Sequence, residues 1–130
     1  MKIMVGYDGS EASMRAVELA ISHAQAFDGK IVAVASMDRG TENELEDINV
    51  LEEALKRLKN DIEEKGISCD THLLIRGMSP GEDLVRYALE QEIDEIILTI
   101  QRKSKVGKLI FGSTAQHVIL NAPCPVVTIT

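Results

Sequence analysis

Apolar runs and amphipathic stretches alternate along this chain, and the pattern predicts strands that alternate with helices. The short apolar runs show little polar alternation, which is typical of strands covered on both faces of a parallel sheet. Between them, apolar residues recur three or four positions apart, as they do on one face of a helix. The predicted strands cover residues 2–7, 31–35, 72–75, 94–99 and 124–129.

Four helices are predicted between these strands. They are expected after Ser10, over about residues 45–65, after Ser79 and over residues 114–121. Ser10 and Ser79 are suitable N-cap residues, and Pro80 suits the first position of a helix. Gly29 and Gly66 are expected to end the first two helices, because glycine is the residue that best caps a helix C-terminus.

The helical spacing also predicts which side chains are buried. It puts Phe27 on the apolar side of the first helix and Leu89 on the apolar side of the third. Strands and helices alternate throughout, which indicates a doubly wound α/β protein with one parallel sheet. A length of 130 residues suits a single domain over residues 1–130.

Composition narrows the class of protein. Apolar residues make up 45% of the chain and charged residues 27%, with a net charge of −7, which fits a globular protein. The acidic balance speaks against a general nucleic-acid binder. The two cysteines, Cys69 and Cys124, are far apart in the sequence and indicate a reduced chain. No apolar run approaches the ~20 residues of a membrane span, so we expect a cytoplasmic protein with no membrane partner.

One predicted loop is basic, although the chain as a whole is acidic. Four of the 14 basic residues, Arg102, Lys103, Lys105 and Lys108, lie between the fourth predicted strand and the last helix. The rest of the chain holds 10 basic residues against 21 acidic ones. A basic loop before a helix N-terminus is a common anion site in α/β proteins, and a phosphate is the simplest ligand for it. An acidic partner is the alternative.

Two polar turns accompany this loop. Asp8 follows the first strand, where a carboxylate can accept hydrogen bonds from ribose hydroxyls; alternatively, it only turns the chain and caps the first helix. Gly112 and Ser113 open the last helix. Glycine allows backbone amides to approach a phosphate, and Ser113 can either cap the helix or bind the phosphate with its hydroxyl.

No catalytic or metal site is predicted. His23, His72 and His117 have no partners at metal-ligand spacing, and no Ser-His-Asp or Cys-His arrangement can be placed on neighbouring loops.

The last predicted strand ends the given chain and carries Val126, Val127 and Ile129. If it lies at a sheet edge, its unpaired ladder predicts a homodimer.

The assembled pattern resembles the universal stress proteins. The similarity covers essentially all of the chain and rests on three segments: Met-Val-Gly-Tyr-Asp-Gly-Ser-Glu-Ala-Ser at 4–13, Gly-x-Ser-Pro-x-Glu at 77–82, and Phe-Gly-Ser-Thr-Ala-Gln-His-Val at 111–118 followed by Asn-Ala-Pro-Cys-Pro-Val-Val at 121–127. This resemblance implies a five-stranded parallel sheet of order 3-2-1-4-5 with helices on both faces. It also implies frequent dimerisation through the last strand.

The resemblance implies a nucleotide site as well. Members that bind ATP carry Gly-x2-Gly-x9-Gly-Ser/Thr after the fourth strand. Here Gly112 and Ser113 match, with Thr114 beside them, but Thr99 and Arg102 replace the two earlier glycines. A side chain at either place can obstruct the approach of a phosphate, whereas Arg102 can also pair with it.

Asp8 matches the ribose-contacting residue of the family, and Ser36 falls near the expected adenine. The leading hypothesis is therefore a homodimeric sensor or regulator that binds ATP or AMP, with or without Mg²⁺. Two alternatives stay open. One is an interaction module that binds no nucleotide, and the other is a weak ATPase.

Overall fold

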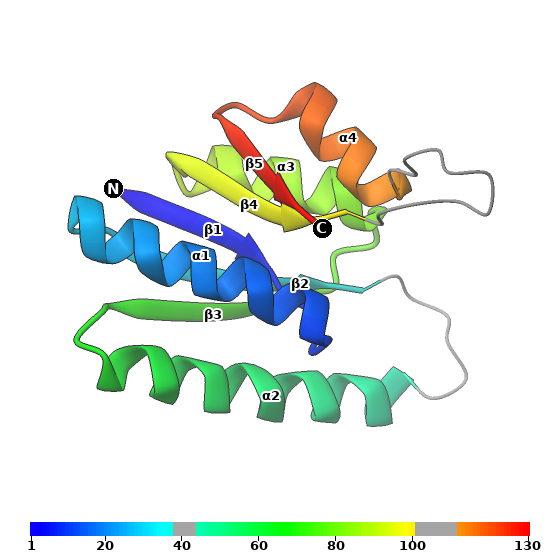
Figure 1. Ribbon diagram of the computed structural model, residues 1–130. Helices are drawn as coiled ribbons and strands as arrows, with labels where there is room; N and C mark the ends of the chain where they lie inside the picture. The colour runs from blue at the N-terminus through cyan, green and yellow to red at the C-terminus, as the bar shows by residue number, and fades with distance from the viewer. Residues whose placement is uncertain (38–43, 101–111) are drawn as a thin grey trace.

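The computed structural model describes residues 1–37, 44–100 and 112–130 (Figure 1). Its five strands form one sheet in the order β3-β2-β1-β4-β5, and every neighbouring pair is parallel. This confirms the expected doubly wound α/β fold and its strand order. The strands are β1 (Lys2–Gly6), β2 (Lys30–Ser36), β3 (Cys69–Leu74), β4 (Glu95–Thr99) and β5 (Val126–Ile129).

Helices cover both faces of the sheet, two on each side (Figure 1). Buried residues of α1 and α2 share one apolar cluster with the strands, and those of α3 and α4 share the other. The helices are α1 (Glu11–Phe27), α2 (Glu44–Glu64), α3 (Pro80–Glu90) and α4 (Ser113–Asn121).

The central strand β1 explains why the apolar runs lack polar alternation. Ile3 and Val5 pack on the side of α1 and α2, while Met4 packs on the side of α3 and α4. All three side chains are fully buried. Because successive residues of a strand point to opposite faces, a strand covered on both faces must be apolar throughout.

The helix caps follow the prediction in part. The Ser10 side chain accepts a hydrogen bond from the backbone N–H of Ser13 at 3.1 Å, as an N-cap should. Ser79 occupies the N-cap position of α3, with Pro80 first in the helix, but its side chain makes no capping bond. At the end of α1 the expected Gly29 is not the cap. Asp28 takes the left-handed conformation there, with φ at 53°.

Two strand boundaries differ from the prediction by more than one residue. β3 begins at Cys69 rather than at residue 72, because it is an edge strand whose first residues include polar, half-exposed side chains that break the apolar signal. β5 begins at Val126 rather than at residue 124.

Two side chains that were expected to be buried are exposed. Leu89 is 59% exposed, because Tyr87 and Ala88 fill the buried side of α3 and the next residue turns away from it. Phe27 is 61% exposed at the end of α1, where the edge of its ring meets His23 on the surface.

Gly81 allows close contact between α3 and α4. A Cβ atom at this position would lie 2.8 Å from Cβ of His117 and 3.3 Å from the backbone oxygen of Thr114. The nearest atom is bonded directly to the backbone of α4, so it cannot swing aside as the end of a long side chain can. The spacing of the two helices therefore depends on the missing side chain.

We predict that Gly81→Ala destabilises the fold by about 1–3 kcal/mol, the usual cost of overpacking. Helix propensity alone predicts the opposite sign, a gain of about 1 kcal/mol. Urea unfolding followed by circular dichroism measures the difference. Arg86→Ala, at an exposed position of the same helix, is the matched control and should change stability by less than about 0.5 kcal/mol. A Gly81→Ala variant more stable than wild type contradicts the packing argument.

Candidate functional site

A cleft of about 310 Å³ opens at the carboxyl ends of β1, β2 and β4. Beyond these strand ends, the start of α3 and the start of α4 complete its walls. The strand order reverses between β1 and β4, and such a switch point is where open α/β sheets usually bind ligands. Its lining residues are Gly6, Tyr7, Asp8, Ser13, Val34, Ser36, Pro80, Leu84, Leu98, Thr99, Ile100, Gly112, Thr114 and Ala115.

The cleft combines apolar walls with a few polar groups. Val34, Leu84 and Leu98 supply apolar surface. Ser36 supplies a polar atom from the end of β2, and Asp8 supplies another from the turn after the adjacent strand β1. Its volume lies at the lower end of the range of about 300–1,000 Å³ for small-molecule sites. Such a lining suits a flat, apolar ring that also carries hydrogen-bonding groups.

Gly6 leaves room for the side chain of Leu98. A Cβ atom on Gly6 would lie 2.7 Å from Cδ2 of Leu98. Both residues line the cleft, so the missing side chain at position 6 helps to fix how Leu98 faces it.

Asp8 shapes its turn and also lines the cleft. Its Oδ1 accepts a hydrogen bond from the backbone N–H of Ser10 at 2.9 Å, so it does shape the turn before α1. It also lines the cleft. Burial raises the pKa of Asp8, but hydrogen bonds from Ser10 and Ser13 outweigh it and hold the pKa below its ordinary value. The group is therefore an ionised acceptor at neutral pH.

A second hollow adjoins the cleft beside Asp8. The two share Asp8, Thr99 and Ile100, and the second also includes Ser10, Ala12, Arg15 and Thr130. Nε of Arg15 donates a hydrogen bond to the backbone oxygen of Thr130 at 3.2 Å. Asp8 thus lies where the two hollows meet.

The start of α4 differs from the prediction in one detail. Gly112 is the N-cap residue, and Ser113 is the first helical residue and is exposed. Gly112 and Thr114 line the cleft, whereas Ser113 is not among its lining residues. Ser113 therefore does not cap the helix, because the chain enters α4 one residue earlier than that role requires.

The cleft brings together Asp8, Ser36, Thr99, Gly112 and Thr114 from the predicted site. The basic residues Arg102, Lys103, Lys105 and Lys108 lie outside the described residues and remain sequence predictions.

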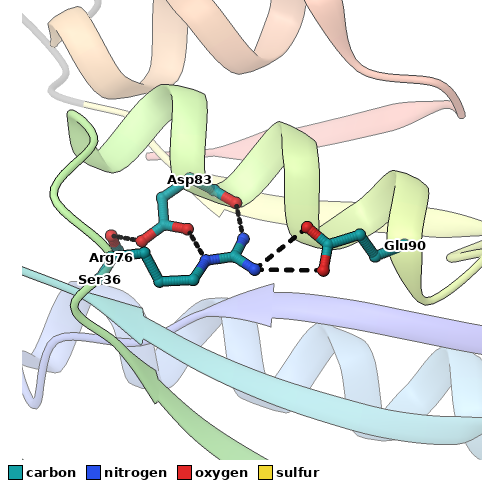
Figure 2. A network of polar contacts seen from close by, with 4 residues as sticks. All are labelled: Ser36, Arg76, Asp83 and Glu90. Carbon is teal, nitrogen blue, oxygen red and sulfur yellow. Dashed lines mark hydrogen bonds and ion pairs between the residues drawn. The ribbon is translucent and has the colours of Figure 1, made fainter.

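Behind Ser36 lies a polar network that the sequence pattern did not reveal (Figure 2). Asp83 is an acidic residue on α3, and its side chain is 0% exposed. Its Oδ1 accepts a hydrogen bond from Nε of Arg76 at 2.5 Å, and its Oδ2 lies 3.4 Å from the hydroxyl oxygen of Ser36. The network thus runs from the interior to the lining of the cleft.

Arg76 is held from several sides. Beyond Asp83, it donates to both carboxylate oxygens of Glu90, at 3.1 and 3.2 Å, and its guanidinium lies 5.9 Å from the ring centre of Tyr87. Burial lowers the pKa of Arg76, but the hydrogen bond and charge of Asp83, followed by those of Glu90, outweigh it and raise the pKa. Arg76 therefore stays charged and balances the buried carboxylate.

One signal in the sequence marks this pair. Asp83 lies beside Leu84 and four residues before Tyr87, on the side of α3 that is otherwise apolar. A carboxylate on the buried face of an amphipathic helix needs a partner. The pattern did not tell which cation that partner is.

We predict that Arg76→Met destabilises the fold by about 3–5 kcal/mol, because it leaves the buried carboxylate of Asp83 unpaired. Glu90→Gln should cost less than about 1 kcal/mol, because Glu90 is 45% exposed and its ion pair is solvated. Chemical denaturation of both variants tests this contrast. Equal losses of stability in the two variants would mean that the buried pair contributes no more to stability than the exposed one.

The last strand has the position that the dimer prediction requires. Among the described strands, β5 pairs only with β4 and lies at the edge of the sheet. Val126, Val127 and Ile129 are each partly buried.

Within residues 1–37, 44–100 and 112–130, no helix is long and apolar enough to cross a membrane. No cluster of three or more His, Cys, Asp or Glu side chains there could hold a metal ion.

Comparison with known proteins assigns the chain to a family. The model of the universal stress protein family matches residues 1–130. The chain belongs to this family. A universal stress protein of Methanocaldococcus jannaschii is 32% identical over 98% of this chain and 81% of its own length.

Two solved structures are also similar to this family member. The universal stress protein of Archaeoglobus fulgidus has a TM-score of 0.89 and 35% identity, covering 100% of this chain and 98% of its own. A universal stress protein structure from the same organism, in complex with dAMP, has a TM-score of 0.82 and 32% identity with the same coverage.

Proposed function

We propose that this universal stress protein binds an adenine nucleotide in the cleft and acts as a sensor or regulator. The observation that carries the proposal is the position of Asp8, an ionised acceptor in the wall of a small, largely apolar cleft. The similar Archaeoglobus fulgidus structure in complex with dAMP supports it. ATP and AMP are the candidate ligands for this chain.

The polar groups of the cleft suggest an orientation for the nucleotide. The base fits between Val34 and Leu84, near Ser36, and the ribose hydroxyls fit against Asp8. The phosphates then lie toward Gly112 and the N-terminus of α4, whose backbone N–H groups and dipole favour an anion.

We infer that the nucleotide is a bound signal and that any hydrolysis is slow. Along the described walls, Asp8 supplies the one carboxylate, and one of its oxygens already accepts the N–H of Ser10. A group committed to its own turn and placed against the ribose is poorly suited to activating water.

We predict that Asp8→Ala weakens the binding of AMP and ATP by tenfold or more, since a hydrogen bond to a charged group is worth about 1.5–3 kcal/mol. Asp8→Asn keeps an oxygen for the Ser10 turn and removes only the charge, so it separates ligand contact from turn geometry. Isothermal titration measures all three proteins. Because the pKa of Asp8 is lowered, Asp8 stays ionised from about pH 5 to pH 8 and should itself cause no change in affinity there. A rise in affinity across that range would instead follow the second ionisation of the ligand phosphate, at about pH 6.

The control for this experiment is Asp61→Ala, at an exposed position of α2. It should bind the nucleotides as wild type does. If wild-type protein gives no heat and no thermal shift with nucleotide at about millimolar concentration, the nucleotide proposal is wrong, and an interaction module becomes the better description. Phosphate release from ATP above a buffer blank would instead favour the weak ATPase.

Homodimerisation through β5 is part of the same proposal. An edge strand with apolar side chains is a ready template for pairing with another strand, and a second copy of β5 offers the same surface. The pairing also places two clefts in one particle, which suits a regulator whose state must be read by a partner.

We predict that Thr128→Lys reduces dimer formation, because a lysine on an edge strand disfavours pairing with another strand. Sedimentation equilibrium at tens of micromolar should give a dimer mass for wild type and a lower average mass for the variant. Thr71→Lys, on the opposite edge strand β3, is the matched control and should leave the mass unchanged. A wild-type monomer at this concentration contradicts the proposal.

A further inference from the structure

Ser36 differs from the other polar residues of the cleft because its hydroxyl contacts a buried carboxyl group, that of Asp83. Its hydroxyl oxygen is 3.4 Å from Oδ2 of Asp83, and the residue itself lines the cleft at the end of β2 (Figure 2). Asp83 belongs to α3, is fully buried and is not among the residues that line the cleft. The direction of the Ser36 hydroxyl proton therefore depends on whether Asp83 donates or accepts the hydrogen bond between them.

The ion pair decides the direction of that hydrogen bond. A guanidinium can only donate hydrogen bonds, so Oδ1 of Asp83 accepts from Arg76 and the side chain is held as a carboxylate. A carboxylate carries no proton to give. The remaining oxygen, Oδ2, must therefore accept from Ser36, and the hydroxyl donates its single proton away from the cleft.

A serine held in this way has only lone pairs left for a ligand. Its oxygen accepts hydrogen bonds and cannot donate one, and the bond to a charged acceptor makes it a better acceptor. Among purine bases, adenine carries an amino group at position 6, which donates. Guanine and hypoxanthine carry a carbonyl oxygen there, which only accepts and would face the lone pairs of Ser36.

We propose that Ser36, oriented by the Arg76–Asp83 pair, selects a 6-aminopurine over a 6-oxopurine. The proposal rests on the proposed nucleotide function and names the base that the same cleft prefers. Ser36 is the residue that contacts the base. Asp83 and Arg76 are positioning residues, since they act through the direction of one hydroxyl proton.

The test compares three ligands that share ribose and phosphate. They are AMP, purine riboside 5′-monophosphate, in which hydrogen replaces the amino group, and inosine 5′-monophosphate, in which oxygen replaces it. Wild-type protein should bind AMP about tenfold more tightly than the purine riboside, as expected for one hydrogen bond. It should bind the inosine compound more weakly still, because two acceptors then face each other.

The variant Ser36→Ala completes a thermodynamic cycle with the first two ligands. It should reduce the affinity for AMP to that for the purine riboside 5′-monophosphate. The affinity for the purine riboside compound itself should not change. Ser22→Ala, on the exposed side of α1, is the matched control and should keep the tenfold preference. A preference that survives unchanged in Ser36→Ala overturns the proposal.

Asp83→Asn tests the direction of the proton. An amide can donate to the Ser36 oxygen, which frees the hydroxyl to donate into the cleft, so the preference for AMP over the inosine compound should shrink or reverse. If this variant does not fold, the comparison of wild type and Ser36→Ala with AMP and the purine riboside compound still tests the proposal. If none of the three ligands binds wild type, the nucleotide function has failed; if they all bind equally well, only the selection by Ser36 has failed.

Discussion

The position of β1 between β2 and β4 is the constraint on which the rest of the structure depends. It pairs in parallel with both neighbours, and the chain continues in opposite directions from it, toward β3 on one side and β5 on the other. The helices that follow β1 and β4, α1 and α4, pack on opposite faces of the sheet. The cleft lies between them, and Asp8 belongs to it because it follows the central strand directly.

Two different contacts then hold the walls of the cleft. On one wall, the Arg76–Asp83 pair anchors α3 to the segment that follows β3, with Ser36 at its end. On the other, Gly81 lets the start of α4 approach α3. The first contact is polar and buried, and the second is a matter of steric fit. Both are made by α3, so this one helix sets the shape of the site.

Most of the fold and part of the site could be predicted from the sequence. The apolar runs indicated the strands, because burial on both faces leaves a strong signal in any chain. Ser10 and Ser79, which occupy N-cap positions, indicated where two of the helices begin. The boundaries of β3 were missed, since an edge strand is half exposed. Asp83 was missed because its partner, Arg76, comes from a different element, and sequence spacing carries no information about contacts of that kind.

The close contact at Gly81 has a consequence for how this chain can diverge. Thr114 and Ala115, which line the cleft, lie in the same first turn of α4 whose backbone oxygen at Thr114 faces Gly81. A descendant that gains a side chain at position 81 must move α4 outward and carry that cleft wall with it. Residue 81 and the width of the cleft are therefore expected to change together, even though Gly81 is not among the residues that line the cleft.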